Sequence, residues 1–206
     1  DADCELLEKV GAAFVFAPSV EEIYPEPDTR QFSYAPLDTV MEGRFRPGHF
    51  NGVCQIVSKL FLIVEPTRAY FGEKDFQQLA IIREMVRKYP FNLEIVGCPI
   101  VREADGLALS SRNARLSDEQ RIQALQISKT LFASVEYAQT HTLAETKAFV
   151  ESAISTAEGL RLEYFEIVDG NSLQTVCDWK DGSYIVGCIT VFCGEVRLID
   201  NIKYKE

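Results

Sequence analysis

One stretch of the chain contains the pattern of a strand, a helix and a second strand in direct succession, and this pattern constrains the fold most. Residues 68–71 (RAYF) are a short apolar run, and residues 93–101 (LEIVGCPIV) are a longer one. Between them, Asp75 begins a predicted helix with one apolar face, which Pro90 ends. A helix that connects two strands of one sheet makes a right-handed crossover, so the strands are predicted to be parallel. The pattern predicts an α/β fold.

Two polar segments follow the two predicted strands. GEKD (72–75) leaves the first strand, and VREADGLALSSRN (101–113) leaves the second. Because the carboxyl ends of parallel strands share one edge of a sheet, we expect the two segments to meet across a crevice. That edge is where open α/β sheets bind ligands.

The tetrapeptide 72–75 combines features that suit an anion. Gly72 allows a sharp turn, Lys74 carries a compact positive charge, and Asp75 starts a helix whose free N–H groups attract negative charge. The alternative is an ordinary strand–helix turn with a solvated lysine. Taken alone, the tetrapeptide favours that alternative.

Gln78 has two interpretations. Its amide is predicted at the floor of the crevice, where it can hold a hydroxyl or a carboxylate. However, Asp75 and Gln78 also have the spacing of a capping box, in which Gln78 bonds back to Asp75.

Residues 110–113 place two hydroxyls, a guanidinium and an amide side by side. Ser110, Ser111 and Arg112 are suited to wrap a triphosphate, with the arginine binding it bidentately. The alternative is a helix N-terminus with spare serine caps. A structural loop seldom needs so many donors, so we favour the functional interpretation.

The rest of the chain predicts a second domain and a long connection. Ser117 and Gln120 form a capping-box pattern before a helix. Helices followed by consecutive strands indicate a small α+β domain, and we place the two domains at residues 1–101 and 102–206. The other predicted elements are a helix end (1–10), a buried strand (12–18), an irregular stretch (19–50), a helix capped by Asn51 and ended by Pro66, helices 118–138 and 143–158, and strands 162–168, 184–192 and 195–200.

Composition excludes several classes of protein. The net charge of −10 argues against a nucleic-acid partner, and no apolar run approaches the ~20 residues of a membrane span. The six cysteines form no CxxC pair, which favours buried reduced thiols in a cytoplasmic protein over zinc ligands. The sequence contains no GxxxxGK[ST], GxGxxG or GxSxG motif.

A basic aromatic turn precedes the predicted helix at Asn51. Residues 44–50 (RFRPGHF) are suited to a ligand gate or simply to a rigid loop. We interpret His49, taken alone, as structural.

Three ordered segments together resemble one family. RPGHFNGVCQIVSKLF (46–61), YFGEKDFQQL (70–79) and VREADGLALSSRNARLS (101–117) closely resemble the pantothenate synthetases, the pantoate–β-alanine ligases. FAPSVEEIYP (16–25) and RLIDN (197–201) also fit. The resemblance covers essentially the whole chain.

The resemblance implies an ATP-dependent ligase of the HxGH nucleotidyltransferase superfamily. Its nucleotide domain is Rossmann-like, and a smaller C-terminal domain acts as a lid. The expected reaction joins pantoate to β-alanine through a pantoyl adenylate, with ATP and Mg²⁺. The resemblance further implies a cytoplasmic homodimer in the full-length protein, with small-molecule substrates and neither nucleic acid nor membrane as a partner.

The resemblance also assigns roles to residues. It implies catalytic roles for Lys74, Ser110, Ser111 and Arg112, and substrate binding by Gln78 and Arg46. It does not indicate which residues bind the metal. The ATP contacts that it implies are Gly72, Glu73, Lys74, Asp75, Val101, Leu109, Ser110, Ser111 and Arg112.

One departure from the family pattern is large. No HxGH occurs, because His49 belongs to PGHF, a different motif. The glutamine-bearing segment that helps hold both substrates is not found either. We therefore predict an N-terminally truncated nucleotide domain in a fragment of a longer protein, which has little or no ligase activity alone. We also expect an open sheet edge that favours self-association.

Two alternatives to this ligase remain. One is a related nucleotidyltransferase with another carboxylic acid substrate, against which Gln78 and the three-segment match argue. The other is a non-catalytic folding or interaction domain whose site residues are vestigial. A measurement of ATP binding distinguishes the non-catalytic domain from the ligase, since the ligase is expected to bind ATP.

Overall fold

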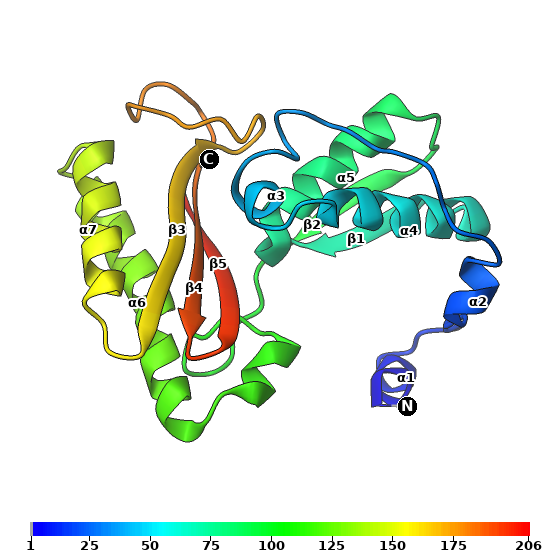
Figure 1. The fold of residues 1–206 in the computed structure, drawn as a ribbon, viewed down its shortest axis with the longest axis horizontal. Coiled ribbons are helices and arrows are strands. Elements are labelled where there is room, and N and C mark those ends of the chain that lie inside the picture. Colours follow the sequence, from blue (N-terminus) through cyan, green and yellow to red (C-terminus); the bar gives the residue numbers. More distant parts are fainter. Residues whose placement is uncertain (1) are drawn as a thin grey trace. The chain divides into compact units, whose positions relative to one another are not determined.

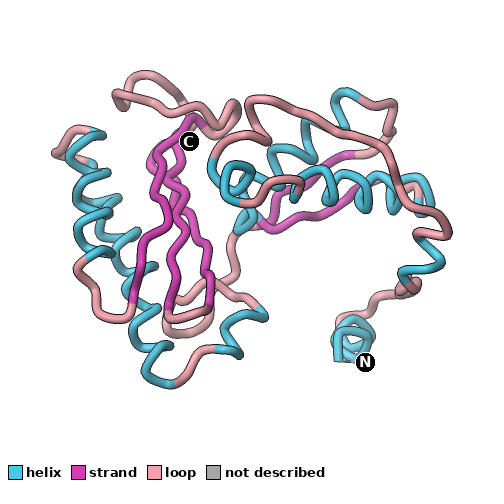
Figure 2. Tube along the Cα trace, viewed as in Figure 1, coloured by secondary structure: helices cyan, strands magenta, loops and turns pink. Residues whose placement is uncertain are grey.

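The computed structural model describes residues 2–206, which divide into two compact units between Gln31 and Phe32. Figures 1 and 2 show the order of helices and strands along the chain. Asp1, the first residue of the predicted helix 1–10, lies outside the described residues. The division predicted at residues 101 and 102 remains a prediction.

The first unit contains two short helices, α1 (Ala2–Lys9) and α2 (Val20–Ile23). The Ser19 hydroxyl accepts the backbone N–H of Glu22, whose carboxylate accepts the N–H of Ser19, so a complete capping box starts α2. The helix predicted at 1–10 is confirmed from Ala2 to Lys9.

The strand predicted at 12–18 is wrong. These residues form an irregular segment, and Phe14 is 94% exposed. A strand needs a neighbour to pair its backbone N–H and C=O groups. The two sheets formed by residues 2–206 consist of β1–β5, none of which includes this segment.

The second unit begins with two helices, α3 (Met41–Phe45) and α4 (His49–Val64). The prediction that Asn51 caps α4 is wrong, because the helix already starts at His49 after Gly48. Gly48 has a φ of 80°, which only glycine adopts at little cost. The Asn51 side chain instead accepts the backbone N–H of Phe32 at 2.7 Å.

The predicted strand–helix–strand unit is confirmed. It consists of β1 (Arg68–Gly72), the 3₁₀ turn η1 (Glu73–Asp75), α5 (Phe76–Lys88) and β2 (Glu94–Cys98). The strands are parallel, with Arg68 opposite Glu94 and Gly72 opposite Cys98. The strand predicted to reach residue 101 ends at Cys98, because Pro99 has no N–H to donate to a ladder. The core here includes Cys54 and Phe61 of α4 and Ile81, Ile82 and Met85 of α5.

The C-terminal part is the predicted α+β arrangement. Its elements are η2 (Ser111–Arg115), α6 (Asp118–Ala138), α7 (Leu143–Ser155), β3 (Leu160–Asp169), β4 (Ile185–Cys193) and β5 (Val196–Lys205). The strands form an antiparallel sheet in the order β3–β4–β5, and α6 and α7 cover it (Figure 1). Ser117 and Gln120 form the predicted capping box of α6. The core includes Ile127, Leu131, Val150, Phe165 and Ile189.

A third apolar cluster joins these two parts of the second unit. Met41 of α3 and Phe76 of α5 pack with Val168 of β3 and with Val186 and Cys188 of β4. Burying each such side chain contributes about 1.5–3 kcal/mol. This packing brings the start of α5, next to the carboxyl end of β1, against the antiparallel sheet.

The cysteines only partly follow the expectation of burial. All six are free, and Cys54, Cys188 and Cys193 are buried. Cys4 and Cys177 are exposed, so the expectation is wrong for them. Burial raises the pKa of the Cys54 thiol to about 12, which leaves it protonated near neutral pH. Within residues 2–206, every helix is too short or too polar to cross a bilayer.

Candidate active site

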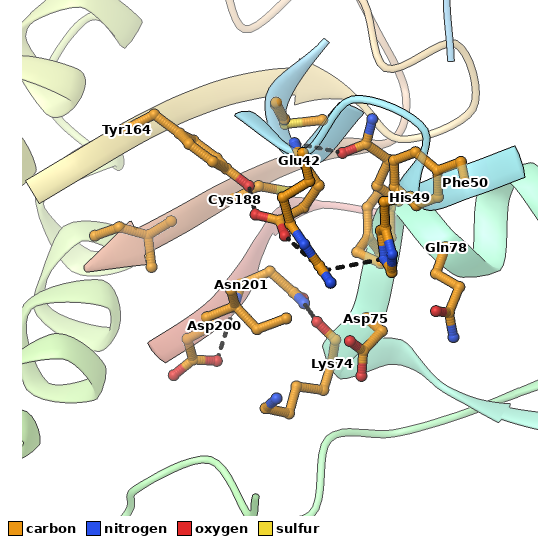
Figure 3. Close-up of a pocket in the computed structure, with 16 residues that line it drawn as sticks. Glu42, His49, Phe50, Lys74, Asp75, Gln78, Tyr164, Cys188, Asp200 and Asn201 are labelled. Carbon is orange, nitrogen blue, oxygen red and sulfur yellow. Dashed lines mark hydrogen bonds and ion pairs between the residues drawn. The ribbon is translucent and has the colours of Figure 1, made fainter. Parts of the chain in front are cut away.

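A cavity lies at the carboxyl end of β1, between η1 and the antiparallel sheet (Figure 3). Three regions far apart in sequence line it: the α3–α4 region, the η1–α5 turn, and strands β3, β4 and β5. Its lining residues are Met41, Glu42, Arg46, His49, Phe50, Lys74, Asp75, Phe76, Gln77, Gln78, Tyr164, Cys188, Ile189, Ile199, Asp200 and Asn201.

A second cavity adjoins the first, and Lys74 and Asp200 line both. The second cavity is also lined by Ser110, Arg112 and Asn113. The structure thus brings the segment after β1 and the segment after β2 to one place, as the parallel pattern predicted. Lys74 and Arg112 face one cavity rather than opposite sides of the molecule.

The predicted site residues differ in where they lie. Arg46, Asp75 and Gln78 line the first cavity. Val101 and Leu109 are 64% and 53% exposed, and neither is among the lining residues of these two cavities. Gly72, Glu73 and Ser111 flank lining residues on the same segments. The roles assigned to all these residues remain predictions.

The capping interpretation is wrong for Gln78, whereas Ser110 does cap a helix. Asp75 makes no side-chain capping bond at the start of α5, so the capping-box interpretation of Gln78 is wrong. The Gln78 side chain instead lines the cavity (Figure 3). Ser110, in contrast, caps η2, since its hydroxyl accepts the backbone N–H of Arg112 at 3.3 Å.

Glu42 is a buried carboxylate that the sequence did not indicate. Its oxygens accept bonds from Arg197 Nη2 and Nη1 at 2.7 and 2.8 Å, from the Tyr164 hydroxyl at 2.9 Å and from the Thr190 hydroxyl at 3.1 Å. Burial disfavours the charged form, but the bonds and charge of Arg197 outweigh it and lower the pKa of Glu42 to about 2. Glu42 is therefore ionised at neutral pH.

Arg46 connects Glu42 to His49. Its Nη1 lies 3.4 Å from Glu42 Oε2 and 3.0 Å from His49 Nε2. Arginine can only donate, so His49 Nε2 accepts and the ring proton belongs on Nδ1. Burial and the neighbouring Arg46 charge lower the pKa of His49, which keeps the imidazole neutral at pH 7.

Strand β5 supplies three further residues that sequence reasoning missed. Arg197 and Asp200 line the second cavity, and Asp200 and Asn201 line the first. Their only signal in the sequence is the segment RLIDN (197–201), which belongs to the family resemblance. Glu42 gave no signal, because its partners lie far along the chain.

The fold and the site together define a class of protein. It is an α/β protein whose cavity opens at the carboxyl ends of parallel strands, beside a helix start and the cationic side chains of Lys74, Arg112 and Arg197. Such a place suits an anionic ligand such as the phosphates of a nucleotide.

Comparisons with known proteins identify the family. The sequence model of the family described as Pantoate-beta-alanine ligase matches residues 1–203. The pantothenate synthetase of Phocaeicola vulgatus is 82% identical over 206 residues, and that of Bacteroides thetaiotaomicron is 76% identical. In both cases the match covers 100% of this chain and 73% of the relative. The chain belongs to the pantoate–β-alanine ligase family.

Solved structures agree with this assignment. A pantothenate synthetase crystal structure from Thermus thermophilus has a TM-score of 0.94 and 44% identity, over 100% of this chain and 74% of that one. A pantoate–β-alanine ligase from Francisella tularensis, complexed with β-γ ATP and β-alanine, has a TM-score of 0.74 and 29% identity, over 98% and 69%.

Proposed function

We propose that this chain supplies the phosphate-binding part of a site for the ATP-dependent condensation of pantoate with β-alanine. One observation carries the proposal: Lys74 lines a cavity with Ser110 and Arg112, and also lines the adjoining cavity with Gln78. A single lysine thus stands between the residues proposed for ATP and the residue proposed for the acid.

The proposed ATP contacts are of the types that phosphates require. Lys74 contributes a compact charge, and Arg112 a planar fork that can bind two phosphate oxygens. Ser110 and Ser111 add hydroxyl donors. Gly72, Glu73, Asp75, Val101 and Leu109 complete the proposed nucleotide contacts.

Two displacements make up the proposed reaction. The pantoate carboxylate, held by Gln78 with Arg46 near the entrance, attacks the α-phosphorus of ATP. An O–P bond forms, the bond to the β-phosphate bridging oxygen breaks, and pyrophosphate leaves. The amine of β-alanine then attacks the acyl carbon, loses a proton, and displaces AMP. Positioning and charge stabilisation are the main contributions of the protein to such transfers.

Magnesium is proposed to accompany the nucleotide. Mg²⁺ usually binds through substrate phosphates, water and one or two carboxylates, so it needs no dedicated protein cage. Residues 2–206 contain no cluster of three or more metal-ligating His, Cys, Asp or Glu side chains. Carboxylates of this cavity such as Asp75 suit that limited role.

Location and assembly follow from the family resemblance. We propose a cytoplasmic setting, which the six free cysteines support because a reducing compartment keeps thiols free. We also propose a homodimer for the full-length protein.

Ligase assays test the proposed function. The purified chain of residues 1–206 should form little or no pantothenate. Activity should appear when the HxGH-bearing segment of a family member is joined before residue 1, a fusion called here the extended chain. In the extended chain, Lys74→Ala should lower kcat/KM by about 10²–10³-fold, because it removes a group that stabilises developing charge.

The matched control is Lys129→Ala, which removes an exposed lysine of α6 and should leave the rate unchanged. Appreciable pantothenate formation by residues 1–206 alone would refute the predicted inactivity. An unaffected rate in the Lys74→Ala extended chain would favour a non-catalytic domain with vestigial site residues.

A further inference from the structure

Two adjacent residues of β5 each hold one of the two segments that line the second cavity. Asn201 contacts the turn that carries Lys74, and Asp200 contacts the base of the loop that leads to Arg112. Resting on the proposed function, we propose that Asp200 and Asn201 are positioning residues that align Lys74 and Arg112 on the triphosphate.

Asn201 acts on the Lys74 turn through the backbone. Its amide Nδ2 donates to the carbonyl oxygen of Glu73 at 2.8 Å. The same amide donates to the carbonyl oxygen of Lys74 at 3.1 Å (Figure 3). Asn201 is only 4% exposed, so water does not readily replace these bonds. Because one amide binds both carbonyl groups, it fixes the orientation of η1. The orientation of η1 in turn sets the direction in which the Lys74 side chain points.

Asp200 acts on the other segment through Arg102. The two oxygens of its carboxylate accept Arg102 Nη1 at 2.7 Å and Nη2 at 2.9 Å. Arg102 also donates to the carbonyl of Gly106 at 3.2 Å, and its backbone pairs with Ala108. The pair therefore anchors the narrow base of the loop from which residues 110–112 extend.

The two anchors are coupled to each other. Asp200 Oδ1 accepts the backbone N–H of Asn201 at 2.8 Å, and the two residues are consecutive and buried on β5, the edge strand of the antiparallel sheet. Because each residue holds a different segment, loss of either contact lets one segment move relative to the other. Because misplacement by about 1 Å can cost ~100-fold in such reactions, the spacing between Lys74 and Arg112 depends on this strand.

Asn201→Asp tests the proposal with almost no change in shape. An ionised aspartate places negative oxygens against two carbonyl oxygens, so the Lys74 turn should shift. A protonated aspartate can donate one hydrogen bond and partly restore the contact. The measured quantity is the dissociation constant for AMP divided by that for ATP, both determined with the 206-residue chain. This ratio reports the contacts of interest because, under the proposal, only the triphosphate reaches both Lys74 and Arg112.

At about pH 8 we expect Asn201→Asp to weaken ATP binding ~10-fold, comparable to one lost buried hydrogen bond. AMP binding should change less than about twofold. Burial and the two facing carbonyl oxygens should raise the pKa of the introduced carboxyl above the ordinary aspartate value. Relative to the wild-type ratio at each pH, the defect should therefore shrink at about pH 6, where more of this carboxyl is protonated. The control Asn171→Asp, at an exposed loop position, should match wild type at both pH values.

Circular dichroism melting checks that each variant is folded. If Asn201→Asp does not fold, Asn201→Ser and Asn201→Ala replace it, and serine, which keeps one donor, should bind ATP more tightly than alanine. A wild-type ATP preference that is unchanged in these variants overturns the positioning role alone. The lack of any ATP preference in the wild-type chain overturns the proposed function, and the inference with it.

Discussion

Arg197 of β5 and Glu42 at the start of α3 form a bidentate ion pair, with N–O distances of 2.7 and 2.8 Å. The Glu42 side chain is 11% exposed and that of Arg197 21%, so the pair is largely shielded from water. It connects the antiparallel sheet to the region that positions Arg46 and His49 beside the cavity.

Removal of the Glu42 carboxylate should destabilise the chain strongly. Glu42→Ala removes one of the two carboxylates that pair with Arg197, which keeps Glu163, and it removes the acceptor of the Tyr164 hydroxyl. Loss of such charged and buried hydrogen bonds costs about 1–3 kcal/mol. Urea unfolding measures the change in the free energy of unfolding. Glu158→Ala, which truncates an exposed glutamate, should change it by less than about 0.5 kcal/mol. Equal stabilities of the two variants would show that the pair contributes nothing.

The same pair predicts a loss of stability in acid. The pKa of Glu42 is about 2 in the folded chain, below its ordinary value of about 4.3. Between these two pKa values the carboxyl of Glu42 binds more protons in the unfolded chain than in the folded chain. The contribution of Glu42 to the free energy of unfolding is therefore full above about pH 5 and is lost as the pH falls toward 2. The total amounts to about 3 kcal/mol, at roughly 1.36 kcal/mol per pKa unit.

Glu42→Gln isolates this contribution from those of other carboxylates. The difference in unfolding free energy between wild type and Glu42→Gln should be constant above about pH 5 and narrow steadily from there to about pH 3. A difference that stays constant over this range would mean that Glu42 is not the titrating group.

Gln78 should affect the acid substrate more than the nucleotide. In the extended chain, Gln78→Ala removes an amide from the cavity floor and should raise the KM for pantoate about 10-fold, as expected for one hydrogen bond to a charged group. The KM for ATP should change less than about twofold. The exposed Gln126→Ala of α6 is the control. A change in the KM for ATP alone would instead indicate that Gln78 contacts the nucleotide.

Self-association is expected from exposed apolar side chains beside an open strand. Leu62, Ile63 and Val64 end α4 with exposures of 62%, 53% and 53%, and Tyr70 of β1 is 63% exposed. In the sheets formed by residues 2–206, β1 pairs with β2 alone, so its other edge is open. Light scattering should show a mass that rises with concentration, and Tyr70→Lys should reduce the rise. A constant monomer mass would contradict this expectation.

Local signals predicted most of the fold. The capping box at Ser117 located α6, and the apolar runs that Gly72 and Pro90 interrupt located β1 and α5. Where a residue serves a distant partner, local reasoning failed. Asn51 looks like a helix cap, but its amide oxygen binds the backbone of Phe32. Residues 12–18 are apolar enough for a strand, but apolarity does not supply a partner.

For the candidate site too, the local sequence pattern predicted some residues and missed those that act on distant parts of the chain. The strand–helix–strand pattern was sufficient to bring Lys74 and Arg112 to one cavity. The residues that hold those segments in place were not predictable, because Asp200 and Asn201 act on loops about a hundred residues earlier in the chain. Glu42, similarly, owes its low pKa mainly to Arg197, with smaller contributions from Tyr164 and Thr190. Such pairings exist only after the sheet has formed.

The most direct test is the preference of the 206-residue chain for ATP over AMP, measured by calorimetry. If Lys74 and Arg112 jointly hold the triphosphate, the wild-type chain should bind ATP at least ~10-fold more tightly than AMP. Lys74→Ala and Arg112→Ala should each remove most of that preference, whereas Lys129→Ala should retain it. A preference that survives both substitutions, or a wild-type chain that binds the two nucleotides equally, would contradict the account.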